Sequence, residues 1–496
     1  MQRQEMRTPV VITLIRNITI ALLSFISFPF AAQALGDIAM GQYSWAHTFV
    51  HYFLILSRLG IPLIAIRECA RVKDDPELLN RKVKTFFVLQ LITTLASYLL
   101  MATILLIGRD VIAPLDLRNL IFLLSINFLI GVFSFEWVYI ALDKVFYMAM
   151  RTILTTIFTV ILIIVFVQND RHLFLYAFLN IVVTIITVIA NLANLRKLGI
   201  KIDPKVKVER GYITKSFLFV FLITFAITAY NQNDSLLLGY LDTSKSSVGS
   251  YAVGVRGIEI VITIITSLSA VFMIRTTRAL EEKNMKAFHN IISYSVNIIF
   301  FIGVPAVMFM IALAPEIVKF IVTSSPYWTA AAVKNAEIAV MMLAGLMLTY
   351  SLHDSIYQQV LIPLKQEKTY LIIMIGALLF NLVFSIVGAL YIFPNNKMFA
   401  VALATLLSEA IALVILFILT KDYIVQHIAS LNNLKIILSS GVALALSILI
   451  KSFMSLEPLI TIITTIAIGG VIYIALLLLL KEDIVKSLFK GNKNNG

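Results

Sequence analysis

The chain has 496 residues, of which 60% are hydrophobic and only 14% are charged, a composition that excludes a soluble globular protein of this length. Lys and Arg number 40 against 27 Asp and Glu, and these residues are confined to short stretches between apolar runs of about twenty residues. Basic residues placed in this way are orientation signals of membrane spans, and their pattern argues against binding of nucleic acid.

Apolar runs long enough to cross a bilayer recur along the whole chain. Backbone groups in lipid must hydrogen-bond within their own segment, so each run is predicted to be an α-helix. The first run has no signal-peptide cleavage site after it and is interpreted as a retained span. Pro29, Pro62 and Pro305 fall inside predicted spans, where kinks are expected. The predicted spans are 10–34, 42–66, 84–107, 118–141, 150–168, 173–195, 212–239, 250–274, 289–313, 332–352, 369–393, 398–420, 434–451 and 458–480.

The basic residues are distributed unevenly between the two ends of these spans. Most of the 40 Lys and Arg lie at the N-terminus and in every second connection, including the stretch 196–215 and the connection with Lys144 and Arg151. Because basic connections stay in the cytoplasm, both termini are predicted to be cytoplasmic in a multi-pass protein of the bacterial cytoplasmic (inner) membrane. The basic residues that remain inside predicted spans are Arg16, Arg58 and Arg256.

Two regions of the chain resemble each other. Residues 35–43 contain Leu-Gly followed by Gly-Gln-Tyr, and residues 238–251 contain Leu-Gly followed by Gly-Ser-Tyr. Gly41 and Gly249 are 208 positions apart, as are Arg67 and Arg275. Glycine at these positions is expected to let the turn before each span pass close to the next helix. Chance similarity between two apolar segments is the alternative, but two six-span halves of like orientation explain the pattern better.

Paired halves are typical of transporters that work by alternating access. The fold class predicted is therefore all-α integral membrane, with about fourteen transmembrane helices in two pseudo-symmetric lobes around a central cavity. The predicted domains are residues 1–200 with spans 1–6, residues 201–425 with spans 7–12, and residues 426–496 with spans 13–14 and a cytoplasmic tail.

Several short motifs carry a family resemblance: Phe28-Pro29-Phe30, Leu35-Gly36, Gly41-Gln42-Tyr43-Ser44, Arg67-Glu68-Cys69-Ala70-Arg71, Leu238-Gly239 and Gly249-Ser250-Tyr251. With the span count and the repeat, the sequence resembles Wzx-type O-antigen or polysaccharide flippases of the multidrug/oligosaccharidyl-lipid/polysaccharide exporter superfamily. The resemblance implies a cavity that opens alternately to each side and handles an undecaprenyl-pyrophosphate-linked oligosaccharide. It also implies essential arginines on the first, second and eighth spans, which here are Arg16, Arg58 and Arg256.

Charged side chains inside spans are the candidate functional residues, because a charge at mid-bilayer costs about 2.5 to 3.5 kcal/mol on insertion scales. Arg16 lies on a polar stripe with Asn17, and His47, His51 and Arg58 share one face of the second span. An arginine binds a pyrophosphate through two parallel hydrogen bonds and stays charged at any working pH. The predicted substrate-binding residues are Arg16, Arg58, Arg256, Asn17 and Asn231.

A second set of residues could relay protons, bind a cation or neutralise the arginines. These are Glu136, Asp234, Glu259, Glu409 and His51. Glu259 lies one turn after Arg256, close enough to pair with it. Packing or protonation is favoured for His47 and His51 over a metal pair, because no third ligand is evident. For each arginine the alternative role is an internal salt bridge or snorkelling to a lipid headgroup. No metal or cofactor is predicted, while coupling to Na⁺, H⁺ or the membrane potential stays open.

The expected function is that of a flippase carrying a lipid-linked oligosaccharide, such as an O-antigen unit, from the cytoplasmic to the outer leaflet. A multidrug or cation exporter of the same superfamily is the alternative. A membrane glycosyltransferase or polymerase is disfavoured because no connection is long enough for a catalytic domain, and no phosphate-binding loop occurs. The single Cys69 offers no disulfide or metal cluster. The protein is thus predicted not to be an enzyme, and its expected partners are the lipid-linked sugar, membrane lipids, a polysaccharide polymerase and glycosyltransferases.

Overall fold

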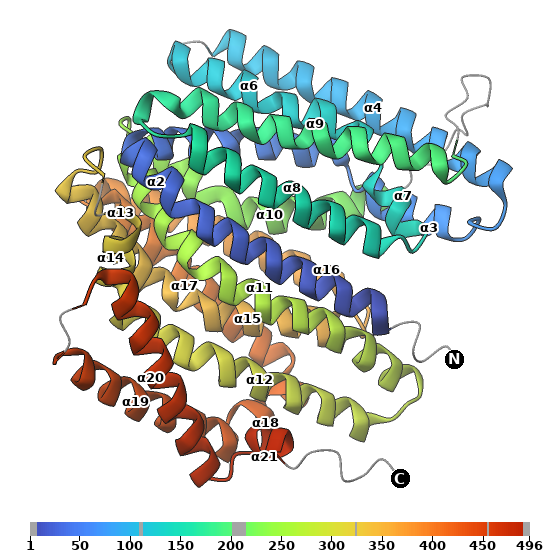
Figure 1. Cartoon of the computed structure of the whole chain (residues 1–496). Helices are drawn as coiled ribbons and strands as arrows, with labels where there is room; N and C mark the ends of the chain where they lie inside the picture. Colours follow the sequence, from blue (N-terminus) through green and yellow to red (C-terminus); the bar gives the residue numbers. More distant parts are fainter. Residues whose placement is uncertain (1–6, 109–112, 201–214, 323–324, 454–455, 490–496) are drawn as a thin grey trace. The chain divides into compact units, whose positions relative to one another are not determined.

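The structure is a computed structural model that describes residues 7–108, 113–200, 215–322, 325–453 and 456–489 (Figure 1). Nearly all of these residues are helical, and they contain no strand. Within them, 12 helices are long and apolar enough to cross a membrane. The predicted all-α membrane architecture is confirmed.

Two further spans bring the number to the predicted fourteen. Helix α2 (Arg7–Arg58) has 52 residues, about 78 Å at 1.5 Å per residue, which is more than twice the thickness of a bilayer core. Gly36 interrupts it with φ 77° and ψ 178°, a backbone conformation that favours glycine. Helix α10 (Lys215–Leu241) is long enough to span but carries the polar run 231–234. The predicted connection over 35–41 is wrong, since the kink at Gly36 replaces a loop.

Two predicted spans are broken inside the first part of the chain. Helix α2 ends at Arg58, Leu59 and Gly60 have φ 42° and 74°, and α3 (Ile61–Ala70) begins there with Pro62 in its first turn. The predicted kink at Pro62 is therefore wrong, because this proline starts a helix, where its missing N–H has no cost.

The predicted span 118–141 is broken in the same way. It divides into α6 (Leu115–Gly131), the short turn η1 (Val132–Ser134) and α7 (Glu136–Ala141), with Phe135 at φ 50°. Each break leaves a charged residue, Arg58 or Glu136, at the end of a helix.

Contacts divide the chain into two compact units, Met1–Gly249 and Ser250–Gly496. The first unit contains α2, α3, α6, α7 and α10 together with α4 (Pro76–Ile107), α8 (Val145–Phe166) and α9 (Leu173–Lys197). Helices α3, α4 and α7 share a buried apolar core that includes Phe86, Phe135 and Tyr139. The predicted lobe boundary near residue 200 concerns internal symmetry and stays a prediction. By its packing, α10 belongs with α2.

The described part of the second unit contains thirteen helical elements. Helix α15 (Leu346–Ile356) continues into a π-helical turn, η3 (Tyr357–Leu361), and α16 (Glu367–Val387) continues into another, η4 (Gly388–Ile392). The remaining elements are α11 (Ser246–Glu281, from Ser250 onward), α12 (Met285–Ala312), α13 (Ala314–Val322), α14 (Ala330–Ala344), α17 (Lys397–Leu419), α18 (Lys421–Ile428), α19 (Leu431–Lys451) and α20 (Pro458–Leu479), followed by α21 (Asp483–Phe489).

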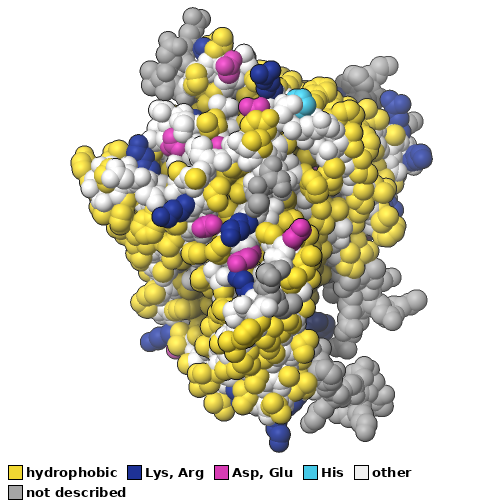
Figure 2. Space-filling model, turned by 60° about the vertical axis from the view of Figure 1, so that its left-hand side comes forward, with side chains coloured by type: hydrophobic (Ala, Val, Ile, Leu, Met, Phe, Trp, Pro, Cys, Tyr) yellow, Lys and Arg dark blue, Asp and Glu magenta, His cyan; other side chains and the backbone are white. Residues whose placement is uncertain are grey.

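The outward-facing side chains of the spans are apolar. Leu99, Ile372 and Val471 are 65%, 72% and 71% exposed. Figure 2 shows hydrophobic side chains covering most of the visible face. Such a surface is stable in lipid and would aggregate in water. The protein is therefore a multi-pass integral membrane protein.

The glycines of the internal repeat meet each other in the first unit. A Cβ at Gly41 would lie 1.8 Å from the Lys245 carbonyl oxygen, and a Cβ at Gly249 would lie 2.1 Å from the Asp37 carbonyl oxygen. The Asp37 carboxylate accepts a hydrogen bond of 2.5 Å from the Ser246 hydroxyl beside them. The expected close approach at these glycines is confirmed, and no larger residue fits there.

Candidate functional site

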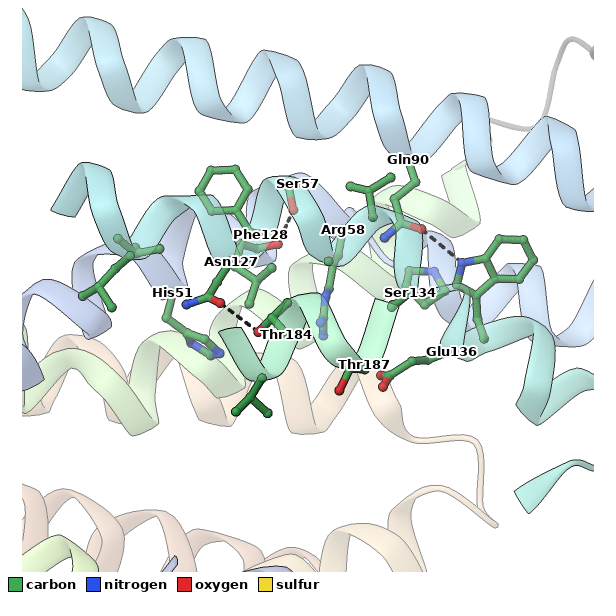
Figure 3. Close-up of a pocket in the computed structure, with 18 of the residues that line it drawn as sticks. His51, Ser57, Arg58, Gln90, Asn127, Phe128, Ser134, Glu136, Thr184 and Thr187 are labelled. Carbon is green, nitrogen blue, oxygen red and sulfur yellow. Dashed lines mark hydrogen bonds between the residues drawn. The ribbon is translucent and has the colours of Figure 1, made fainter. Parts of the chain in front are cut away.

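The first unit encloses a cavity of about 450 Å³. This volume lies within the usual range of about 300 to 1,000 Å³ for small-molecule sites. Its walls come from α2, α3, α4, α6, α7 and α9 (Figure 3). Its polar lining consists of His47, His51, Ser57, Arg58, Gln90, Asn127, Ser134, Glu136, Thr184 and Thr187.

Arg58 is the cationic side chain that lines this cavity. It is the last residue of α2, and the break at Leu59 and Gly60 turns the chain away after it. Its side chain is exposed, and the space it faces is the cavity, where Figure 3 draws it above Thr187 and beside Glu136. Arg58 also interacts electrostatically with Glu136. An arginine held in this way keeps its donors available to a ligand.

Glu136 is held in the cavity wall by an arginine from another helix. A nitrogen of Arg151 lies 2.8 Å from a Glu136 carboxylate oxygen, and the other terminal nitrogen donates to the Asn191 side chain at 2.8 Å. Asn191 in turn donates to the Ser134 carbonyl at 2.5 Å. Arg151 is 7% exposed and Glu136 is 45% exposed. The network joins α7, α8 and α9 and leaves half of the carboxylate facing the cavity.

Arg16 completes a cluster with excess positive charge. It interacts electrostatically with both Glu136 and Arg151. Its guanidinium donates to the Asn17 side chain at 3.1 and 3.3 Å. Three guanidinium groups therefore act on one carboxylate, since Arg58 interacts with Glu136 as well. The four side chains together carry a net positive charge.

The histidines of α2 lie where their spacing predicts. His47, His51 and Arg58 all line the cavity, so the predicted shared face is confirmed. The two imidazole rings are stacked with centroids 6.1 Å apart. The Nδ1 atom of His51 is buried and makes no hydrogen bond, while Arg58 acts on the ring electrostatically. His51 therefore has an unused polar atom at the cavity wall.

The polar residues of α10 pack against α2 and do not line the cavity. Asp234 is 4% exposed and interacts electrostatically with Tyr52, and Asn231 is exposed. The Trp45 indole donates to the Leu236 carbonyl at 3.0 Å, which ties the two helices together. Asn231 and Asp234 are thus not brought to Arg58.

In the second unit the structure gives the other candidates two different settings. Arg256 and Glu259 form the expected ion pair at 2.6 Å, with 42% and 48% of their side chains exposed. An exposed pair of this kind contributes little to stability. Glu409, by contrast, is 1% exposed and lies 2.7 Å from His353. The second unit thus contains one exposed ion pair and one buried pair.

Two residues escaped the sequence-based assignment. Arg151 was assigned to a connection, but α8 begins at Val145 and encloses it. The count of basic residues inside spans is corrected accordingly. His353 was not identified as the partner of Glu409. The position of Arg151 at the edge of an apolar run is a sequence signal that places it inside a helix. Helical spacing relates residues of one helix, so it gives no signal for partners on different helices.

Comparisons with known proteins place the fold. The chain matches the family model described as polysaccharide biosynthesis protein over residues 8–272 and the MatE model over residues 220–387. A search of the curated proteins finds none that matches. A multidrug resistance MATE family transporter of the MOP superfamily, in an inward-facing conformation, is similar at 14% identity over 84% of this chain and 98% of its own, with a TM-score of 0.64.

Two further solved structures share the fold. The lipid II flippase MurJ, in an inward closed conformation, is 16% identical over 97% of this chain and 98% of its own, with a TM-score of 0.54. A MOP superfamily transporter from Pyrococcus furiosus, described as having a binding pocket of reverse polarity, is 17% identical over 85% of this chain and 96% of its own, with a TM-score of 0.51. Because the first family model spans more than half of the sequence, the chain belongs to the polysaccharide biosynthesis protein family.

Proposed function

We propose that the protein is a flippase that carries an undecaprenyl-pyrophosphate-linked oligosaccharide from the cytoplasmic to the outer leaflet of the bacterial inner membrane. Membership of the polysaccharide biosynthesis family and the fold shared with the lipid II flippase support a transporter of this class. The observation that carries the substrate assignment is Arg58 in the wall of the first-unit cavity, together with the electrostatic action of Arg16, Arg58 and Arg151 on the single carboxylate of Glu136.

The cavity chemistry suits a pyrophosphate. Arg58 presents a planar fork of donors that matches phosphate oxygens, and the cavity wall adds the hydroxyl of Thr187. Arg151 holds Glu136 by a direct ion pair, which limits how far that carboxylate neutralises Arg58. A cavity of about 450 Å³ is sized for a head group, so the polyprenyl chain stays in lipid.

Arg16 and Asn17 are assigned to the same head group, since Arg16 belongs to the same electrostatic cluster. The roles of Arg256 and Asn231 in substrate binding stay predictions, since neither residue lines the cavity. Translocation by alternating access requires no catalytic step and no cofactor. Glycosyltransferases would supply the substrate at the cytoplasmic face, where both termini lie in this proposal, and a polymerase would consume it outside.

A multidrug or cation exporter is the second candidate, because the MatE model matches residues 220–387 and MATE transporters share the fold. The cavity of the first unit argues against it. A cationic drug in this cavity would meet the guanidinium of Arg58 and a carboxylate that already pairs with Arg151, while Arg16 and Arg151 act electrostatically from behind the wall. Like charges in a site of low dielectric constant repel strongly, so such a ligand would be excluded.

The decisive experiment measures binding of undecaprenyl pyrophosphate to the purified full chain in lipid nanodiscs. Arg16→Ala and Arg58→Ala are each expected to weaken binding about 10- to 100-fold, because a charge-assisted hydrogen bond contributes about 1.5 to 3 kcal/mol. Arg71→Ala is the matched control, since Arg71 is 58% exposed and pairs with Glu68. It should bind like the wild type.

Cells carrying the same variants at matched protein levels are then scored for surface polysaccharide. Cells with Arg16→Ala or Arg58→Ala should lose surface polysaccharide, and cells with Arg71→Ala should retain it. Unchanged binding of undecaprenyl pyrophosphate in both Arg16→Ala and Arg58→Ala would refute the anion site. Export of a cationic dye that is abolished by Glu136→Gln would favour the exporter instead.

A further inference from the structure

The second unit holds an acid and a base together in its dry interior. His353 on α15 and Glu409 on α17 lie with Nδ1 2.7 Å from a carboxylate oxygen, and their side chains are 2% and 1% exposed. Burying an unpaired charge in such a place costs several kcal/mol of free energy, so each of the two groups must be neutralised by the other or by a proton. Both helices belong to membrane-spanning segments.

The pair has room for one more proton. When Nδ1–H donates to an ionised Glu409 and Nε2 is bare, the pair carries one negative charge. When Nε2 also carries a proton, or when the carboxyl keeps its proton and donates to Nδ1, the pair is neutral. Nε2 of His353 is buried and makes no hydrogen bond, so it is an unpaired polar atom at this place, a donor or an acceptor according to the tautomer.

The charged groups around the pair are acidic. Glu409 and Asp354 are the groups that act electrostatically on His353. Asp354 is bonded to Gln358 at 2.8 and 2.9 Å. The tyrosines that share the cluster are Tyr350 on α15, Tyr357 in η3 and Tyr370 on α16, and Glu367 acts on Tyr357. The groups named here are acidic or phenolic apart from His353 itself, and a proton bound at the pair reduces the repulsion between their negative charges.

A distorted turn lies next to the pair. The π-helical segment η3 (Tyr357–Leu361) follows directly on α15. Such turns are rare in helices and occur frequently at functional sites. Within η3, the side-chain amide nitrogen of Gln359 donates to the Ser295 hydroxyl at 2.8 Å. The side-chain amide oxygen of Gln359 is buried and makes no hydrogen bond. A second unpaired polar atom therefore lies on the same segment, and a π-turn can shift register when the unit changes conformation.

We propose that His353 and Glu409 form a proton-binding site whose loading is coupled to the conformational change of the second unit. The proton comes from water, binds at the His353–Glu409 pair and leaves when the pair is hydrated or pulled apart. A metal ion is a poorer occupant, because the described residues contain no group of three or more His, Cys, Asp or Glu able to hold one. The claim that the proton drives translocation rests on the proposed function. The claim that the pair binds a proton does not depend on that function.

The first test needs no lipid-linked substrate. Infrared difference spectra of the full chain in nanodiscs, recorded between acidic and alkaline pH, should show bands of a titrating carboxyl and imidazole. Glu409→Gln and His353→Gln should each remove these bands. Glu457→Gln and His289→Gln are the matched controls, since Glu457 is exposed and His289 is half-buried, and they should leave the bands intact.

A double variant guards against misfolding. Replacing a buried pair by apolar residues is often tolerated, so His353→Leu combined with Glu409→Leu should fold and lack the bands. Bands that persist unchanged in this folded double variant would overturn the proposal, as would bands that persist in both single variants.

The second test asks for coupling. Proteoliposomes containing an undecaprenyl-pyrophosphate-linked sugar are given a pH gradient, and translocation is followed from one leaflet to the other. The gradient should change the wild-type rate about tenfold, within the usual range of coupling, and change the Glu409→Gln rate by a factor near one. Equal gradient dependence in both proteins would refute coupling. Absence of translocation in the wild type, with the infrared bands present, would instead count against the proposed function alone.

Discussion

The two units of this protein hold charged side chains in opposite ways. In the first unit, Arg58 is exposed to a cavity and Glu136 keeps 45% of its side chain accessible. In the second unit, His353 and Glu409 are 2% and 1% exposed. Charges at a wet surface stay ionised and available to a ligand, whereas charges in a dry core must be neutralised by each other or by a proton. The comparison separates the site proposed for an anion from the site proposed for a proton.

The largest expected effect on stability comes from the buried His353–Glu409 pair of the second unit. His353→Leu leaves the Glu409 carboxyl buried without its imidazole, and we expect the free energy of unfolding to fall by about 3 to 5 kcal/mol. The double change with Glu409→Leu should recover most of that loss. SDS titration of the purified variants measures both. A single variant as stable as the wild type would contradict the dry setting of the pair.

The network behind the cavity should give the next largest effect. Arg151→Ala removes hydrogen bonds to Glu136 and Asn191, and we expect a loss of about 2 kcal/mol in stability, since bonds to charged groups contribute about 1.5 to 3 kcal/mol. The freed Glu136 should pair with Arg58 and weaken binding of undecaprenyl pyrophosphate.

Adding Glu136→Gln to Arg151→Ala provides the control for this effect. The double variant should bind undecaprenyl pyrophosphate more tightly than Arg151→Ala alone, because the competing carboxylate is gone. If the second change weakens binding further, Glu136 contacts the ligand and the interpretation of Arg151 as its holder is wrong.

Replacing Arg58 should have little effect on stability, in contrast to replacing a buried ion-pair residue. Because its side chain faces the cavity, Arg58→Ala should change the free energy of unfolding by no more than about 0.5 kcal/mol. Arg58→Lys should restore only part of the binding, since an ammonium group lacks the planar fork. The same SDS titration and the nanodisc binding assay supply both numbers. A strongly destabilised Arg58→Ala would place this residue with the structural ion pairs.

A carboxylate outside both settings provides the smallest effect and a baseline. Burial opposes ionisation of Asp242, but hydrogen bonds from Ser244 and Ser247 outweigh it and lower the pKa of the carboxyl below its ordinary value. Because the folded pKa is depressed, the ionised form stabilises the fold above the unfolded value of about 3.9, and this contribution is lost as pH falls through the folded pKa.

Asp242→Asn should therefore cost about 1 kcal/mol at neutral pH, the usual size of a hydrogen-bond contribution. The difference from the wild type should shrink as the pH is lowered below about 4. Thermal unfolding in detergent across this range tests the direction. A difference that grows on acidification would reverse the sign of the argument.

Much of the architecture could be predicted because hydropathy acts within each segment. The number of spans follows from apolar runs, and α10 was recognised as a span in spite of the polar run 231–234. The positions of helix breaks were harder. Leu59 and Phe135 adopt positive φ although neither is glycine, and such conformations depend on the packing around them. The predicted continuous spans over 42–66 and 118–141 failed at these points.

What could be inferred from the residues alone concerns neighbours along one helix. His47, His51 and Arg58 share a face, and Arg256 reaches Glu259, because a helix repeats every 3.6 residues. The pairs made across helices, Arg151 with Glu136 and His353 with Glu409, were decided by tertiary packing. No local rule relates residues on separate helices, because the distance between them depends on how those helices cross. The same packing decides that the Glu136 side chain is partly exposed and that Glu409 is buried.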